Sequence, residues 1–244
     1  HCQDRFPPDH SLQRRKPGVC GVVSAVNDVT GYPTTNRSLA EQAHHLLETQ
    51  IINFKLAPGT LLTEKDLAEI TGIGRTPVRE AIQRLAADGL LQVLPRKGLM
   101  VTALRRTDMV NILEARKVLE RLMVVKACER ATPDQRQALL IMAEHAGATG
   151  DDTETLLRVL VRIDELLAAA CHNPFLVRAL AAMQSQCRRL WYMYREETDL
   201  LQATRLHSAL ASMVGEGNGA GAIRALDEII ATLENLVARL DVLS

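Results

Sequence analysis

The chain has 244 residues, of which 47% are hydrophobic and 24% charged, and these ordinary proportions argue against a wholly disordered protein. The formal net charge is zero, but residues 1–106 carry 14 Lys and Arg against 10 Asp and Glu, so a basic part suited to a polyanion precedes an acidic one. No apolar run approaches the roughly 20 residues that span a bilayer, and the five cysteines are not paired in sequence, so we expect a cytoplasmic protein with free thiols.

The first 36 residues contain several prolines and glycines and no sustained apolar period, so we expect a disordered or arm-like segment over 1–36. From residue 37 apolar residues recur at helical spacing. The pattern predicts three helices, over 38–53, 63–70 and 75–88. Thr63 and Asp66 are spaced to cap the second helix. Two short helices with a tight glycine-containing turn between them indicate a helix-turn-helix, whose second helix would enter the major groove of DNA.

Two strand-like segments, 90–94 and 99–102, flank the basic turn from Pro95 to Gly98 and predict a wing. A linker over 103–106 then leads into almost unbroken helical periodicity, whose breaks predict six helices, near 107–130, 133–146, 152–171, 174–195, 199–214 and 219–241. The expected fold is therefore mainly α. It has a winged helix-turn-helix DNA-binding domain over 37–102 and an all-helical domain of six to seven helices over 107–244.

The third predicted helix carries polar residues opposite its apolar stripe, namely Arg75, Thr76, Arg79 and Gln83. These residue types can hold phosphates, and Arg and Gln can also read purine edges through paired hydrogen bonds. Any amphipathic helix shows such residues to water. The adjoining helix-turn-helix pattern and basic wing favour DNA contact over that simpler explanation.

The run from Thr63 to Ala68, the run from Gly72 to Ile82 and the run from Leu85 to Leu90 resemble the winged helix-turn-helix of the GntR family of bacterial transcription regulators. This resemblance spans about 39–102. Residues 107–241 are similar to the all-helical effector domain of the FadR (FCD) subfamily, through Glu114-Ala115-Arg116 and Cys171-His172-Asn173-Pro174.

The resemblance implies DNA contacts at Lys65, Arg75, Thr76 and Arg79 in the helix-turn-helix, and at Arg96, Lys97 and Gly98 in the wing. Gly74 stands where family members usually carry Ser or Thr, so a hydroxyl that would cap the helix or bind phosphate is missing. Glycine is an acceptable cap, and its N–H can serve a phosphate. We therefore expect altered affinity rather than lost binding.

Three polar residues interrupt the apolar stripes of three helices in the second half: Arg116, Asp164 and His207. A buried guanidinium is costly without an anion. Its partner is either Glu120 one turn along, in an ordinary i,i+4 pair, or the carboxylate or phosphate of a ligand. Three such groups on inward faces predict an effector-binding cavity.

In many members of the subfamily this cavity holds a divalent metal bound by one Asp and three His. Leu160 and Ile229 stand at two of the corresponding positions, which leaves Asp164 and His207 as metal ligands. Two protein ligands are few for Zn²⁺, where three or four are usual. We therefore expect no tightly bound metal cofactor.

The sequence thus predicts a homodimeric transcription regulator, acting as a repressor, that binds a palindromic double-stranded operator and is controlled by a small organic acid. The alternatives are an acyl-CoA-responsive regulator, a metal-dependent sensor and, from a different class, a helical adaptor that binds no DNA. An adaptor would not need the Arg-rich helix and basic wing. The chain carries no HExxH, GxSxG or Gly-rich phosphate loop, so we expect no enzyme activity.

Overall fold

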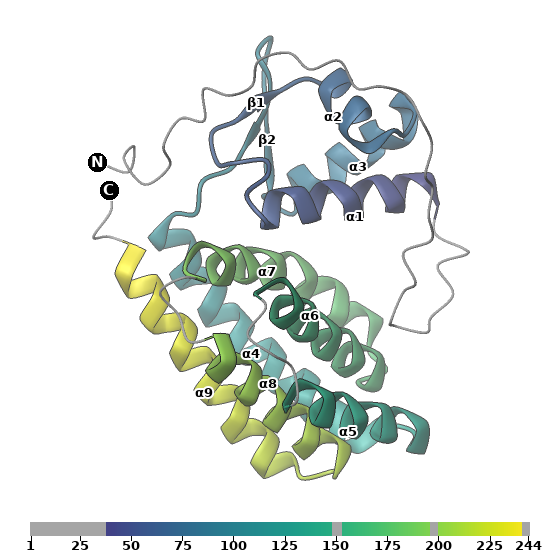
Figure 1. Ribbon diagram of the computed structural model, residues 1–244, viewed down its shortest axis with the longest axis vertical. Coiled ribbons are helices and arrows are strands. Elements are labelled where there is room, and N and C mark those ends of the chain that lie inside the picture. The colour runs from purple at the N-terminus through teal and green to yellow at the C-terminus, as the bar shows by residue number, and fades with distance from the viewer. Residues whose placement is uncertain (1–37, 148–152, 196–199, 241–244) are drawn as a thin grey trace.

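A computed structural model of the chain shows a smaller N-terminal unit packed above a bundle of helices (Figure 1). Apolar residues form two separate hydrophobic cores, one within residues 43–101 and one within 109–237. The structure describes residues 38–147, 153–195 and 200–240, so the expectation for 1–36 falls outside it. Across the described residues the predicted fold class is confirmed: the chain is mainly helical, with a winged helix-turn-helix followed by a helical bundle.

The winged part contains α1 (Leu39–Ile52), β1 (Leu61–Leu62), α2 (Glu64–Thr71), α3 (Arg75–Ala87), β2 (Leu91–Leu94) and β3 (Gly98–Val101). The predicted cap of α2 is present: the Asp66 N–H donates to the Thr63 hydroxyl, and the Thr63 N–H donates to the Asp66 carboxylate. Gly72 ends α2 with φ of 67°, a left-handed conformation that favours glycine. The chain can therefore turn sharply into α3.

The wing is an antiparallel hairpin of β2 and β3, and β1 adds a short third strand that the sequence did not predict. Leu62 of β1 is paired with Leu99 of β3. Gly98 has φ of 98°, and a Cβ at this position would lie 2.6 Å from the Leu62 carbonyl oxygen. The close approach of β1 to the wing therefore requires glycine at the base of the turn.

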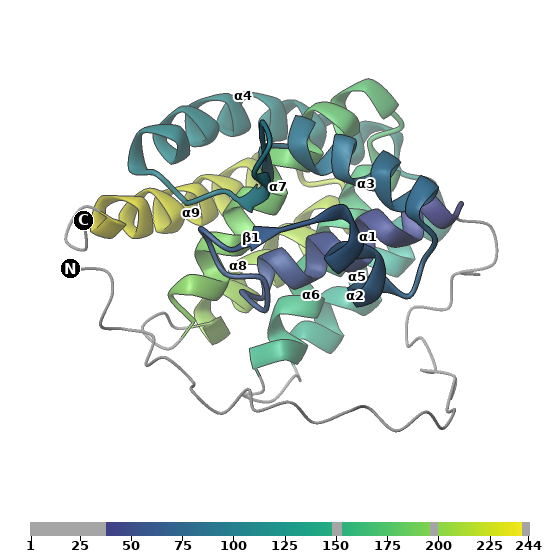
Figure 2. The ribbon, with the colours of Figure 1, turned by 90° about the horizontal axis from the view of Figure 1, so that it is seen from above.

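The bundle contains α4 (Arg106–Arg130), α5 (Pro133–Gly147), α6 (Thr153–Ala170), α7 (Pro174–Met193), α8 (Leu200–Gly215) and α9 (Gly219–Ala238). These are the six helices that the periodicity predicted, although α4 begins at the last residue of the predicted linker. Helix α4 lies alongside α9 and also packs on α6, α7 and α8 (Figure 2). No described helix is both long and apolar enough to cross a membrane.

Candidate nucleic-acid interface and effector pocket

Helix α3 has one buried face and one exposed polar face. Val78, Ala81, Ile82 and Leu85 are buried, whereas all four predicted polar residues of this helix are exposed, namely Arg75, Thr76, Arg79 and Gln83. At its N-terminus, Gly74 provides no side-chain cap. The first backbone N–H groups of α3 therefore have no capping side chain, and such a helix start attracts phosphate.

Arg79 forms a forked ion pair with Glu64, the first residue of α2. Its Nη2 lies 2.8 Å from Glu64 Oε2, and its Nε lies 3.2 Å from each carboxylate oxygen. The hydrogen bond from Arg79 is the main reason that the pKa of Glu64 is lowered. Lys65 instead lies 3.7 Å from Glu69 on its own helix. Glu64 was not among the residues predicted from the sequence.

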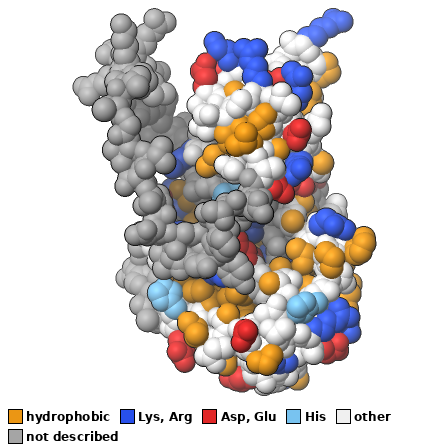
Figure 3. Space-filling model, turned by 90° about the vertical axis from the view of Figure 1, so that its right-hand side faces the viewer, with side chains coloured by type: hydrophobic (Ala, Val, Ile, Leu, Met, Phe, Trp, Pro, Cys, Tyr) orange, Lys and Arg blue, Asp and Glu red, His pale blue; other side chains and the backbone are white. Residues whose placement is uncertain are grey.

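The wing places Arg96 and Lys97 at an exposed turn beside the half-buried Gly98. Lys and Arg side chains gather at the end of the winged domain that lies farthest from the bundle (Figure 3). Lys65 and Gly74 are exposed too, so every predicted DNA-contact residue except Gly98 is exposed.

Replacing Lys97 by alanine should weaken binding to all DNA sequences alike and reduce the slope of log affinity against log salt by about one unit. A cation on an exposed wing contacts phosphate, which carries no sequence information. Fluorescence anisotropy titrations at several salt concentrations would measure both effects. Lys117→Ala, in the bundle, is the matched control and should leave the slope unchanged. A loss confined to one sequence would contradict the phosphate assignment.

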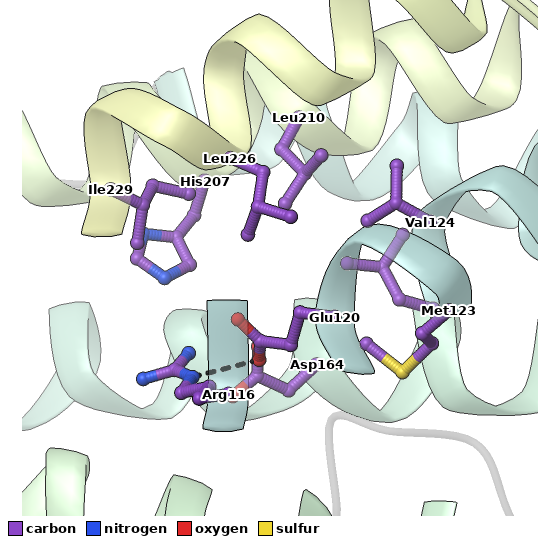
Figure 4. A pocket seen from close by; sticks show the side chains of 10 residues that line it. Arg116, Glu120, Met123, Val124, Asp164, His207, Leu210, Leu226 and Ile229 are labelled. Carbon is purple, nitrogen blue, oxygen red and sulfur yellow. Dashed lines mark ion pairs between the residues drawn. The ribbon is translucent and has the colours of Figure 1, made fainter. Parts of the chain in front are cut away.

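The structure brings Arg116 of α4, Asp164 of α6 and His207 of α8 to one pocket inside the bundle (Figure 4). Aliphatic side chains complete its lining, among them Leu226 and Ile229 of α9. About 10 Å³ of the pocket is open to the centre of a water molecule, which is room for about one water. The pocket must therefore widen to admit an organic ligand.

Arg116 and Glu120 form a buried ion pair on α4. Arg116 Nε lies 2.9 Å from Glu120 Oε1, and the two side chains are 4% and 3% exposed. Gln184 of α7 donates a hydrogen bond of 3.2 Å to the same Glu120 oxygen. Burial by itself would lower the pKa of Arg116, but the Glu120 carboxylate contributes most to reversing that effect and the pKa is raised. The guanidinium therefore stays charged.

Two polar atoms of this ion pair make no hydrogen bond to the described residues, although both are buried: Arg116 Nε, whose contact with Glu120 lacks hydrogen-bond geometry, and Glu120 Oε2. Buried polar atoms are normally hydrogen-bonded. The pair thus retains capacity to bind a polar group that enters the pocket.

Burial shifts the pKa values of both His207 and Asp164 in the direction of the uncharged form. Burial is the main reason that the pKa of His207 is lowered to about 4, so its ring is neutral at pH 7. Nδ1 lies 2.7 Å from the Ala203 carbonyl oxygen and therefore carries the proton, which leaves Nε2 as an acceptor. Burial also raises the pKa of Asp164, whose side chain is 14% exposed.

The residues present do not fit the four-ligand metal site of the FadR-type resemblance. Leu160 and Ile229 are buried aliphatic residues. Across residues 38–147, 153–195 and 200–240, no three or more His, Cys, Asp or Glu side chains are arranged to bind one metal ion.

Helix α7 connects the pocket with the winged domain through Arg188. One guanidinium nitrogen of Arg188 lies 3.9 Å from the Asp164 carboxylate. The other lies 3.4 Å from the carboxylate of Glu48 on α1 and donates a 2.8 Å hydrogen bond to Ser185. The Ser185 hydroxyl also donates to Glu48. A pocket-lining residue and the first helix of the winged domain therefore share one cation.

Two further α7 residues hold the backbone on either side of the wing. The Gln186 amide donates to the Gly89 carbonyl oxygen at 3.1 Å. Arg189 is completely buried and donates to both the hydroxyl and the carbonyl oxygen of Thr102. Burial lowers the pKa of Arg189 to about 10. These contacts were not predicted, but the polar residues Ser185, Gln186, Arg188 and Arg189 around Cys187 are a signal, since one helix face cannot expose all of them.

Comparison with known proteins gives two family matches. The model described as bacterial regulatory proteins, gntR family, matches residues 39–101, and the FCD domain model matches residues 111–232. An uncharacterized HTH-type transcriptional regulator, YdhC of Bacillus subtilis, is 31% identical over 173 residues, which are 68% of this chain and 77% of that protein.

A second relative is the fatty acid metabolism regulator protein of Edwardsiella ictaluri, which is 30% identical over 199 residues, 74% of this chain and 81% of that protein. Among solved structures, E. coli McbR/YncC superposes with a TM-score of 0.69 at 25% identity, covering 84% of this chain and 99% of that one. A putative transcriptional regulator GntR from Rhodococcus sp. RHA1, 18% identical, has a TM-score of 0.60 over 83% of this chain and 98% of that chain, and supports the fold.

Proposed function

The chain belongs to the gntR family of bacterial regulatory proteins and carries an FCD domain after its helix-turn-helix, and from this premise we propose that it is a repressor controlled by a small organic acid. One observation carries the proposal. Helix α7 makes direct side-chain contacts with Glu120 in the polar pocket and with the Gly89 backbone that flanks the wing, and the same winged domain carries the exposed cationic face of α3. Such an arrangement allows a ligand in the pocket to change DNA binding.

On DNA, α3 occupies the major groove and the wing lies near the minor groove. Arg79 and Gln83 face the base edges, while Lys65, Thr76 and the start of α3 at Gly74 bind phosphates. A homodimer would place two copies of α3 on the half-sites of a palindrome. The exposed apolar residues Val118 and Leu122 on α4 support self-association. The protein acts in the cytoplasm, where the operator is.

The pocket chemistry favours a small acid that also carries a hydroxyl group. Its carboxylate binds the Arg116 guanidinium in competition with Glu120. His207 Nε2 accepts a hydrogen bond from the ligand hydroxyl, and Asp164, whose pKa is raised by burial, donates one when it is protonated. Entry of the acid would change the Asp164 environment and hence its contact with Arg188, which reaches α1.

Other functions receive less support from the described residues. An acyl chain needs a long apolar cavity, whereas four polar or charged side chains line this pocket: Arg116, Glu120, Asp164 and His207. A metal-dependent sensor needs more ligands than Asp164 and His207. An adaptor that binds no DNA disagrees with the gntR match over 39–101.

Selecting bound duplexes from a random DNA pool tests the DNA-binding proposal, and Arg79→Ala is the critical variant. It should weaken affinity for the selected operator by about 5- to 150-fold, as loss of a bidentate base contact does. The melting temperature should stay the same because Arg79 is exposed. Arg84→Ala, an exposed arginine in the last turn of the same helix, is the matched control. Unchanged operator affinity in Arg79→Ala would contradict the placement of α3.

Repeating the selection with small hydroxy acids tests the control mechanism. An acid that lowers the recovery of operator DNA from the wild-type protein is the expected effector of a repressor. Increased recovery would mean that the acid strengthens operator binding, and would contradict the expectation that the acid releases the protein from its operator.

A further inference from the structure

Glu64 is an acidic residue beside the cationic face, and its position in the first turn of α2 accounts for only a small contribution to stability. Thr63 and Asp66 already cap α2. The Glu64 side chain is 42% exposed, and exposed ion pairs such as that with Arg79 contribute little to folding stability. Close to DNA, a carboxylate repels phosphate and weakens non-specific binding. The position of Glu64 therefore calls for an explanation other than stability.

The geometry of the pair leaves one edge of the Arg79 guanidinium available. Glu64 accepts hydrogen bonds from Nε and Nη2. No described residue accepts a hydrogen bond from Nη1, and the Arg79 side chain is 63% exposed. Arginine carries five N–H donors in a rigid fork, so Nη1 and the second hydrogen of Nη2 can still bind guanine O6 and N7 together.

We propose that Glu64 is a specificity-determining residue that positions Arg79 to read a guanine and selects against other sequences. The inference rests on the proposed DNA-binding function and extends it. Holding the flexible side chain of Arg79 beforehand reduces the entropy lost when the base contact forms. The Glu64 charge penalises every sequence, and only a correctly placed guanine compensates that penalty.

The test compares affinities for the selected operator and for a random-sequence duplex, measured with the full chain by fluorescence anisotropy. In Glu64→Gln, the ratio of the two affinities should fall by about 2- to 12-fold, which corresponds to the ordering of one long side chain. Affinity for the random duplex should rise, because one negative charge is removed. Glu64→Asp, which keeps the charge but shortens the reach, should lower the ratio without that rise.

Glu69→Gln is the matched control, since Glu69 lies on the same helix, is 66% exposed and pairs with Lys65 instead of Arg79. It should raise affinity for both duplexes and leave the ratio unchanged. If the ratio of operator affinity to random-duplex affinity falls equally in Glu69→Gln and Glu64→Gln, the proposal is overturned, because a general charge effect would explain both. Unchanged ratios in Glu64→Gln and Glu64→Asp would overturn it as well.

Combining Glu64→Gln with Arg79→Ala separates this inference from the proposed function. In the Arg79→Ala background, Glu64→Gln should no longer change the ratio; a further fall would contradict a role through Arg79. If Arg79→Ala by itself leaves the ratio intact, the reading of DNA by α3 is wrong. If Arg79→Ala lowers the ratio and Glu64→Gln does not, only the role of Glu64 is wrong.

Discussion

Replacing Arg116 by methionine should destabilise the folded chain by about 3–5 kcal/mol. The substitution keeps apolar bulk but leaves the Glu120 carboxylate without its partner at a site that is 3% exposed. Urea unfolding followed by fluorescence measures the change, because the single tryptophan, Trp191, is buried on α7 within the bundle. A loss below about 1 kcal/mol, the usual value for a surface pair, would show that the pair is not coupled.

The double variant Arg116→Met with Glu120→Gln should recover most of that stability. It removes both charges, and replacing a whole buried ion pair by neutral residues is often close to neutral. The glutamine side chain keeps an oxygen that can accept the hydrogen bond from Gln184. A double variant no more stable than Arg116→Met would mean that the guanidinium is needed for packing rather than for pairing.

The same double variant separates folding from ligand binding. In thermal-shift measurements, a small hydroxy acid that binds the pocket should raise the melting temperature of the wild-type protein. It should leave the melting temperature of the double variant unchanged, because that variant lacks the charge-assisted contact with Arg116. Equal increases in melting temperature for both proteins would show that the acid binds at another site, or that its binding does not depend on Arg116.

Acidification should destabilise the chain through His207 by about 3 kcal/mol between pH 6.5 and pH 4. The folded His207 binds a proton only near pH 4, because burial disfavours the charged ring, whereas the unfolded chain binds it near pH 6.5. Proton binding therefore favours the unfolded chain between pH 6.5 and pH 4. Above pH 6.5 the ring is neutral in both states, and this destabilisation is absent. Chemical unfolding at pH 7 and at pH 4 measures the difference.

His207→Gln should lose this part of the pH dependence, while His172→Gln, at an exposed site, should keep it. The contribution of Asp164 to the pH dependence of stability has the opposite sign. Burial raises the pKa of Asp164, so its contribution to folding stability falls as the pH rises through the folded-state pKa. Comparing the variants with wild type cancels the Asp164 contribution if its pKa is not altered. An identical pH dependence in His207→Gln and wild type would contradict the buried neutral ring.

Local signals in the sequence were sufficient for the helix-turn-helix, the wing and the six bundle helices. The Thr63 cap, the Gly72 turn and the apolar spacing of α3 act over one or two helical turns, so they can be read directly from the chain. The inward polar residues Arg116, Asp164 and His207 were also visible, because each interrupts an apolar stripe. The pair of Arg116 with Glu120 was one of two open alternatives, since both residues lie on one helix.

The tertiary structure decided which distant residues meet. Arg79 and Glu64 are 15 positions apart, Gln184 and Glu120 are 64 apart, and Arg188 and Glu48 are 140 apart. Periodicity identifies the face on which a residue lies, but it carries no information about the helix that packs there. The small volume of the pocket depends on how the side chains of α4, α6, α8 and α9 fit together. Close packing arises only when all four helices come together, so the pocket volume cannot be predicted from any one segment of the sequence.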